Sequence, residues 1–372
     1  MTRRDRVVLL LLAGSAGSFW LTLGRVQAAS PPKPRPPLTG FATVKVADGV
    51  HAFVASETVA LVSGNSTAIV GDDAVLVVDT GHFPTATRKM IAEIRRLTNK
   101  PVRCVVNTDW HPDHHSGNFV YREQFPDVAI ISTEYTRVQI EKSAGKYDNP
   151  EQLTSTLQAI RAQLAGGKKK NGEPLSAADR EFLEVVSAEA EQAIPELSQV
   201  RLLRPNVGFD QRFTFDLGKR TVEVMFLGRG NTGGDAVVYV PDSKVLISGD
   251  LLVAPTPYAY GSFLTDWIQT LSKLRTMEVV AIVPGHGPVQ HDKHYVELVE
   301  NLLQSVRDQT QSAVKGGLSL EATFAKVDLQ RFRKQLAGED ILRNRAFDMG
   351  FVKPGVERAW REAKEGSLSD EN

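Results

Sequence analysis

Short runs of apolar residues in the first part of the chain predict β-strands joined by tight turns. Asp48-Gly49 and Gly71-Asp72-Asp73 each separate two such runs, which is typical of β-hairpins. A segment with helical spacing follows at 84–97. The predicted strands of this part lie at 44–46, 52–54, 68–70, 74–78 and 102–106.

The same pattern returns later, with strands predicted at 213–217, 222–226, 237–240, 245–247 and 279–283. In each part, the second strand of a hairpin leads into an aspartate, Asp79 in one and Asp250 in the other. This arrangement resembles an internal duplication. Two sheets built from such halves, with helices outside, predict a layered α/β sandwich.

Helical spacing interrupts the strands over 134–198, where a Ser176-to-Asp179 capping pattern begins one of two helical segments. We expect an inserted helical hairpin that covers the functional site. The chain is expected to be helical again over 295–372, as a C-terminal extension of the domain at 41–294.

The N-terminus has the pattern of a secretory signal peptide. Three arginines within the first six residues precede a short apolar run at 7–13, and Val26-Gln27-Ala28 resembles a cleavage site. The apolar run is too short for a membrane span. We therefore expect residues 1–29 to be removed and a proline-rich linker to follow at 30–40.

This pattern predicts a periplasmic or secreted protein with no stable membrane anchor after cleavage. The general secretory route is expected rather than the twin-arginine route, although the pair Arg3-Arg4 keeps the second open. A signal that stays uncleaved as an anchor is the other alternative.

The charge balance gives no reason to expect a nucleic-acid partner. Lysine plus arginine and aspartate plus glutamate both number 44 in 372 residues. The single cysteine, Cys104, lies within a predicted strand and cannot form an intrachain disulfide. It is expected to be a buried structural residue rather than a nucleophile. A small-molecule substrate remains the expected partner.

The segment 107–118 carries the densest chemistry of the chain. His111, Asp113 and His114 follow a predicted buried strand within four residues of one another. Nitrogen and oxygen donors at this spacing can converge on one cation. Asp250 and His286 also follow predicted strands, and the carboxyl ends of such strands are where open α/β sheets place ligands.

This ordered set of residues resembles the metallo-β-lactamase superfamily, whose signature is HxHxDH followed by later His, Asp and His ligands. The resemblance covers about residues 41–290 without the insert, and implies an αββα sandwich with one or two zinc ions between its sheets. It implies that Asp113, His114, Asp250 and His286 form the second metal position. His111 corresponds to a ligand of the first, and Asp250 usually bridges the two.

Two residues depart from the family pattern. Asp109 stands where the signature has its first histidine, and Asn231 stands where a later histidine is usual. The first position would then consist of Asp109, His111, Asn231 and Asp250. Because this set is rich in oxygen, it should bind zinc weakly or prefer a harder ion such as iron or manganese. A hydrolase with one tightly held zinc is therefore the main hypothesis.

The resemblance implies hydrolysis of an ester, lactone, amide or phosphoester bond by metal-activated water, with β-lactams among the candidates. Asp113 and Asp109 are the candidate general bases. Asp79 is expected either to orient a ligand or the loop, or only to cap a turn. Two alternatives remain: an exported metal-binding protein without catalysis, and a persulfide-oxidising iron enzyme of the same fold.

Other residues are assigned more generally. His115 is expected near the ligands or facing substrate, and His51, His82, His291 and His294 are expected to be surface or structural. Four aromatic residues after Asp250 either line a pocket or pack beneath the next helix: Tyr258, Tyr260, Phe263 and Trp267.

Overall fold

The computed structural model describes residues 36–146 and 149–369. The predicted signal peptide and most of the predicted linker lie outside the described residues. Among the residues that are described, no helix is both long enough and apolar enough to cross a membrane.

The first sheet contains seven strands in sequential order. Its first four strands pair antiparallel, and β4 through β7 pair in parallel. The predicted hairpins at Asp48-Gly49 and Gly71-Asp72-Asp73 join β1 to β2 and β3 to β4. The strands are β1 (Phe41–Ala47), β2 (Val50–Ala55), β3 (Ser66–Val70), β4 (Val75–Val78), β5 (Val102–Val106), β6 (Ala129–Thr133) and β7 (Val207–Phe209).

The second sheet contains five strands in the order β12-β11-β10-β9-β8, and only β11 and β12 pair in parallel. Its strands are β8 (Arg212–Asp216), β9 (Thr221–Phe226), β10 (Ala236–Val240), β11 (Val245–Val253) and β12 (Ala281–His286). Two predicted strand ends were wrong. Asp250 lies within β11 and His286 is the last residue of β12, because the pairing continues through register shifts around Gly249.

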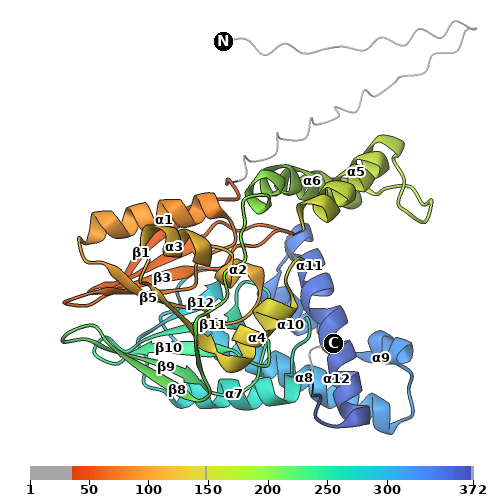
Figure 1. Ribbon diagram of the computed structural model, residues 1–372. Helices are drawn as coiled ribbons and strands as arrows, with labels where there is room; N and C mark the ends of the chain where they lie inside the picture. Colours follow the sequence, from red (N-terminus) through yellow and green to blue (C-terminus); the bar gives the residue numbers. More distant parts are fainter. Residues whose placement is uncertain (1–35, 147–148, 370–372) are drawn as a thin grey trace, which may run out of the picture. The chain divides into compact units, whose positions relative to one another are not determined.

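The two sheets and their helices form the predicted four αββα layers (Figure 1). Alternate residues of β4 show how one strand serves two layers. Leu76 and Val78 pack toward the second sheet, whereas Val75 and Val77 pack against α1 (Pro84–Leu97). Cys104 is fully buried between the sheets, as expected for a structural residue, and burial raises the pKa of its thiol.

Helices cover the outer face of each sheet. Helices α1 and α3 cover the first sheet, and α7, α8 and α12 cover the second. The C-terminal helices therefore share a core with the sandwich. Besides α1, the helical elements are α2 (Pro112–His115), α3 (Asn118–Gln124), α4 (Glu134–Lys142), α5 (Pro150–Gly166), α6 (Ala177–Leu197), α7 (Leu264–Thr276), α8 (His294–Lys315), α9 (Leu320–Lys326), α10 (Gln330–Leu336), α11 (Ile341–Phe347), the π-helical η1 (Asp348–Val352) and α12 (Lys353–Glu365).

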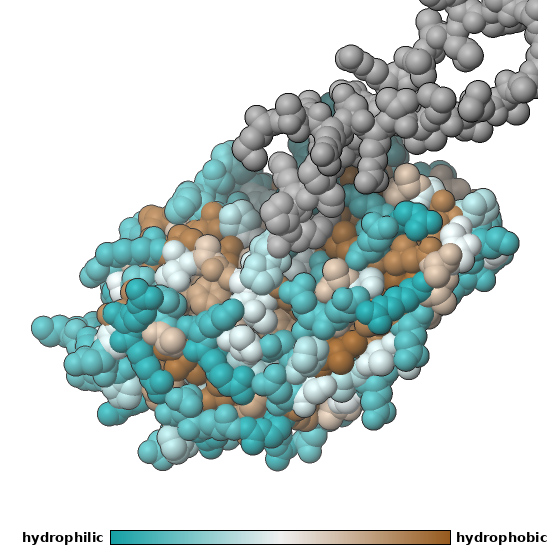
Figure 2. Space-filling view, turned by 90° about the horizontal axis from the view of Figure 1, so that it is seen from above, coloured by the Kyte–Doolittle hydropathy of each residue, from teal (hydrophilic) through white to brown (hydrophobic). Residues whose placement is uncertain are grey.

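Helices α5 and α6 form a hairpin within the predicted insert, and the Ser176–Asp179 capping box begins α6. Apolar surface on the face seen in Figure 2 lies in patches between hydrophilic side chains. Among the described residues, six large hydrophobic side chains are exposed: Leu97, Leu202, Tyr260, Val280, Ile341 and Met349.

Candidate metal centre

Four segments bring the predicted ligands together where the two sheets meet. Asp109 and His111 lie in the loop after β5, and Asp113 and His114 lie on the short helix α2 that follows. Asn231 precedes β10, whereas Asp250 and His286 come from the paired strands β11 and β12. Residues separated by more than 170 positions therefore supply one cluster.

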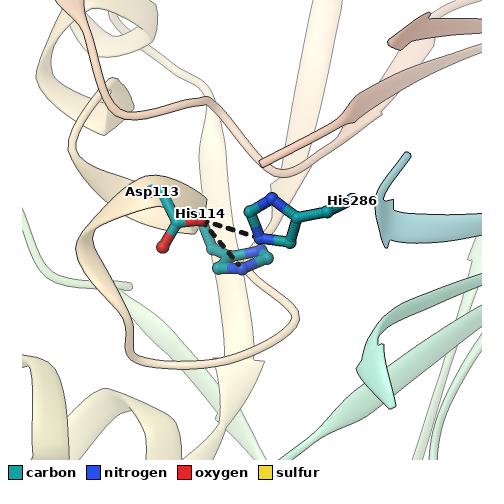
Figure 3. A group of neighbouring side chains, drawn as sticks. All are labelled: Asp113, His114 and His286. Atoms are coloured by element: carbon teal, nitrogen blue, oxygen red, sulfur yellow. Dashed lines mark ion pairs between the residues drawn. The ribbon is translucent and has the colours of Figure 1, made fainter. Parts of the chain in front are cut away.

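The first group of donors consists of Asp113, His114 and His286, whose candidate ligand atoms all lie within 4.8 Å of one another (Figure 3). The Nε2 atom of His286 lies 3.0 Å from Asp113 Oδ2, and that of His114 lies 3.6 Å from the same oxygen. Asp250 Oδ1 is 3.3 Å from His114 Nε2 and 3.4 Å from His286 Nε2. Four donors therefore face one small volume.

The second group consists of Asp109, His111 and Asp250. Asp109 is fully buried, and its Oδ1 accepts a hydrogen bond of 2.7 Å from the backbone N–H of His111. The Asn231 side-chain N–H₂ donates to the backbone oxygen of Tyr258 at 2.8 Å. That bond fixes the orientation of the amide group. The side-chain oxygen of Asn231 has no hydrogen bond and can therefore act as a ligand to a cation.

Buried donor atoms without hydrogen bonds indicate what this cluster can hold. Burying a polar atom without a partner is costly, so such atoms are rare in folded proteins. Here six of them belong to the predicted ligands: Asp109 Oδ2, Asp113 Oδ2, His114 Nε2, Asn231 Oδ1, Asp250 Oδ1 and His286 Nε2. Carboxylate oxygen and imidazole nitrogen are ligands that zinc accepts, so the residues present fit a divalent metal ion.

Charge in the cluster also favours cations. Burial opposes ionisation of all these groups, but the opposite charges outweigh it. The carboxylates of Asp250 and Asp113 raise the pKa of His286 to about 10, and Asp109 is the main group that raises the pKa of His111 to about 9. The histidines in turn hold the pKa values of Asp113 and Asp250 below their usual range. Positive charge is therefore stabilised at this place.

Asp79 holds one of the imidazoles from behind. Its Oδ2 lies 2.9 Å from His114 Nδ1, and the backbone N–H and side-chain hydroxyl of Thr108 donate to the same carboxylate. Asp79 is 1% exposed and has a φ of 56°, a left-handed conformation that is uncommon outside glycine. These contacts orient the imidazole of His114, which is a candidate ligand, and also hold the loop at Thr108.

The absence of a side chain at Gly285 leaves room for the carboxylate of Asp250. A Cβ atom at this position would lie 2.0 Å from Asp250 Oδ1, so a larger residue would displace that carboxylate. Gly249, with a φ of 52°, packs against Thr108 at the irregular pairing of β11 with β12. Such irregularities redirect side chains near functional sites.

A cavity of about 320 Å³ opens above the donors. His111, Asp113, Asn231, Asp250 and His286 line it, whereas Asp109 and His114 do not. Its walls come from four other places: residues 59–62 with His82, Phe182 of α6, the loop residues Tyr258 and Tyr260, and the C-terminal residues Ala346, Met349 and Gly350.

The remaining predictions divide. Tyr258 and Tyr260 line the cavity, but Phe263 and Trp267 belong to the buried core. His82, expected at the surface or in a structural role, is buried and lines the cavity. His115 is buried, with Nε2 3.1 Å from the backbone oxygen of Trp110, and is not among the lining residues.

Asn65, which no sequence pattern singled out, fixes the turn around His286. Its side-chain N–H₂ donates to the backbone oxygens of Pro284 and Gly287, and its backbone N–H donates to that of Gly285. In the sequence, Asn65 stands among the first predicted strands. No local pattern connects it with Pro284 or Gly287, which lie more than 200 positions away.

Glu189 was also missed. It is 7% exposed, and its carboxylate accepts hydrogen bonds from the backbone N–H groups of Val59, Ala60 and Leu61 at 2.8, 2.8 and 3.1 Å. The inserted helix α6 therefore holds the segment that forms one cavity wall. Since α6 contains five glutamates, the sequence does not distinguish the one that makes this contact.

Known proteins share this architecture. The chain is 27% identical to the linear primary-alkylsulfatase of a Pseudomonas species over 271 residues, which are 69% of this chain and 48% of that protein. It is 29% identical to the metallo-beta-lactamase type 2 of Bacteroides fragilis over 117 residues, covering 30% of this chain and 45% of that one. The chain thus spans about half the length of these relatives.

A solved metallo-beta-lactamase from Pontibacter korlensis superposes with a TM-score of 0.50 at 20% identity, covering 71% of this chain and 99% of that one. This likeness supports the fold. The sequence model of the metallo-beta-lactamase superfamily matches residues 59–286, which include every predicted ligand. The chain therefore belongs to the metallo-beta-lactamase superfamily.

Proposed function

We propose that this protein is a metal-dependent hydrolase of small molecules. The observation that carries the proposal is the cluster of six buried ligand atoms without hydrogen bonds, since four of the residues that supply them (Asp113, Asn231, Asp250 and His286) also line an open cavity. A purely structural metal site is usually closed by its protein ligands, whereas a catalytic site keeps a position open to substrate. The hydrolytic names of the relatives agree with this reading.

We assign the tighter metal position to Asp113, His114, Asp250 and His286, with zinc as the expected ion. Two imidazoles and two carboxylates suit zinc. Asp109, His111 and Asn231 would provide, with Asp250, a second and weaker position. Since one carboxylate and one amide replace imidazoles there, iron or manganese are the other candidates.

A divalent ion held by these residues would supply a water of lowered pKa, from 15.7 toward about 7, and would polarise a carbonyl oxygen. The protein's own contribution is the placement of carboxylates around the reacting groups. Asp113 lines the cavity and can accept a proton from the attacking water. Asp109 does not line it, so we assign Asp109 to metal binding rather than to the general-base role.

Metal removal tests the proposal. The mature protein would be assayed against ester, lactone, β-lactam, phosphoester and sulfate-ester substrates, before and after chelation and after zinc is restored. Hydrolysis of at least one class that disappears on chelation and returns with zinc supports the proposal. Stoichiometric metal binding without hydrolysis of any substrate would favour a metal-binding protein without catalysis. Tight binding of iron together with persulfide oxidation would favour a persulfide-oxidising iron enzyme.

We further propose that the protein is exported and that residues 1–29 are removed. The basic, apolar and small-residue order of the N-terminus supports this. Mass spectrometry of the native protein from a fractionated cell measures the terminus. An intact Met1 in the cytoplasmic fraction would contradict export.

A further inference from the structure

The walls of the cavity are apolar, and its charge is confined to the floor. Among the described residues that line it, the charged side chains are the predicted ligands Asp113 and Asp250, together with the histidines, and no lysine or arginine is present. Most wall side chains are aliphatic or aromatic, including Leu61, Phe182 and Met349. The imidazole of His82 is the exception among the described wall residues, and its Nδ1 lies 2.8 Å from the backbone oxygen of Val62.

Two arginines lie near these walls, but other groups occupy them. Arg343 forms a two-pronged ion pair with Glu57, through contacts of 2.8 and 2.9 Å. Arg345 pairs with Asp179, and its guanidinium lies 4.6 Å from the centre of the Phe182 ring. A guanidinium with a carboxylate partner has little free charge to offer to an anionic substrate.

The same contacts join the separate wall segments to one another. Arg343 links α11 to the chain that precedes residues 59–62, and Arg345 links α11 to the start of α6. The hydroxyl of Tyr260 donates to the backbone oxygen of Met349 at 2.8 Å. The insert and the C-terminal extension therefore form one continuous wall whose polar groups are used in holding it together.

The floor also disfavours anions. Asp109, Asp113 and Asp250 bring three carboxylates, so a single divalent ion leaves one negative charge in the donor set. An anionic substrate would approach this charge between walls that supply no cation. A neutral substrate meets no such penalty, and its apolar part gains by leaving water.

We propose that the cavity selects neutral substrates with an apolar body, such as uncharged carboxylic esters and lactones, over anionic substrates. This inference rests on the proposed hydrolytic function. In ester hydrolysis, a bond forms between the water oxygen and the carbonyl carbon, the bond from that carbon to the alcohol oxygen breaks, and a water proton passes to the alcohol oxygen. The products are an acid and an alcohol.

A matched pair of substrates tests the selection. The compounds 4-butyryloxybenzamide and 4-butyryloxybenzoate share a scissile ester and a shape, but only the second is anionic. The wild type should have a higher kcat/KM for the neutral ester, 4-butyryloxybenzamide, than for the anionic one. Octyl sulfate and a carboxylated cephalosporin should also react more slowly than this neutral ester. A higher kcat/KM for any of the anionic compounds would overturn the proposal.

A charge placed on the wall gives the second test. Met349 lines the cavity and is 52% exposed, so Met349→Lys adds a cation there without burying it. This variant should narrow the preference for the neutral ester by up to about fivefold, the effect of one partly exposed ion pair. Ile341→Lys is the control, because Ile341 is equally exposed on the same extension but does not line the cavity. An equal effect of both variants would contradict the assignment of Met349.

Equilibrium binding separates this inference from the proposed function. The affinities of 1-octanol and octyl sulfate for the protein would be measured by calorimetry, below the micellar concentration of the sulfate. Tighter binding of octanol by a protein that hydrolyses none of the substrates would contradict the hydrolytic function and support the selection of neutral molecules. Hydrolysis combined with tighter binding of octyl sulfate would support the hydrolytic function and contradict that selection.

Discussion

The carboxylate of Asp79 lies 2.9 Å from Nδ1 of His114, while Nε2 of that imidazole faces Asp113 and Asp250. A carboxylate on Nδ1 fixes the proton there and leaves Nε2 free to bind a metal ion. Thr108 donates two hydrogen bonds to Asp79, so the carboxylate itself is held in place. The orientation of one ligand thus depends on a residue 35 positions away in the sequence.

Asp79→Asn should weaken zinc binding by about 10- to 100-fold, the usual effect of losing the hydrogen-bonding partner of a ligand. Since the Thr108 backbone N–H donates to Oδ1, the amide oxygen is expected to stay there, and the N–H₂ then faces Nδ1 of His114. That N–H₂ cannot accept a hydrogen bond from Nδ1, so the ring loses its preferred tautomer. Zinc affinity would be measured by competition with a chelating dye. Asp127→Asn, a substitution at an exposed aspartate, is the control. Wild-type affinity in a folded Asp79→Asn protein would show that Asp79 only shapes its turn.

Histidines at the two departing positions should create a second strong zinc site. Asp109→His/Asn231→His supplies two imidazoles beside His111, and imidazole is a stronger zinc ligand than an amide oxygen. The double variant should bind one more zinc ion than the wild type when both are equilibrated with the same zinc buffer. If the wild type already holds two zinc ions with similar affinity, the proposed weakness of the Asp109 position is wrong.

Glu189→Gln should loosen the wall formed by residues 59–62. Three backbone N–H groups lose a charged acceptor, each worth about 1.5–3 kcal/mol at most and less after relaxation. We expect a loss of about 1–3 kcal/mol in the free energy of unfolding, and a raised KM for apolar substrates. Urea unfolding and steady-state kinetics measure the two effects.

The control for this variant is Glu184→Gln, at an exposed position on the same helix. Metal content should remain that of the wild type in both proteins. A lower metal content in Glu189→Gln, with no change in KM, would place the effect at the donors instead of at the wall.

The attachment of α6 to α11 should depend on pH through Asp179. Hydrogen bonds from Ser176 and the ion pair with Arg345 lower the pKa of Asp179 in the folded chain. A lowered folded-state pKa stabilises the fold above the unfolded value of about 3.9, and this contribution is lost as the pH falls through the lower folded value. Asp179→Asn should therefore be less stable than the wild type at neutral pH, with a difference that shrinks in acid.

Thermal unfolding from pH 7 to pH 2 measures this difference, which should shrink as the pH falls below about 3.9. A gap between wild type and Asp179→Asn that stays constant over the range would show that ionisation of Asp179 contributes nothing. Arg345→Gln provides a second variant, which removes the partner and leaves the Ser176–Asp179 capping box in place.

The layers of the fold could be predicted because they follow from local patterns. Val75 to Val78 alternate between two cores, and Met90, Ile91 and Ile94 form the buried face of α1. The ends of β11 and β12 could not be predicted. Their register shifts arise from packing around Gly249 and Gly285, which the strand pattern does not record.

The candidate ligands could be named because HxHxDH-like spacing concentrates donors in a few residues. Their supporting contacts could not. Asn65 and Glu189 form hydrogen bonds with backbone groups far away in the sequence. Because nearly every residue has these backbone groups, such a bond does not restrict which residue type stands at the partner position. The cavity walls likewise come from segments that only the folded chain brings together, such as Phe182 and Met349.

Metal content after the loss of His286 tests the central claim most directly. This residue supplies one of the two imidazoles of the proposed tighter position. His286→Ala should therefore lower zinc affinity by more than Asp79→Asn, for which a loss of about 10- to 100-fold is expected. His294→Ala, at an exposed histidine, is the matched control and should keep wild-type zinc. Both proteins would be equilibrated in the same zinc buffer and analysed by mass spectrometry of the metal. We expect His286→Ala to lose its tightly held zinc; wild-type zinc content and affinity in a folded His286→Ala protein would contradict the proposed site.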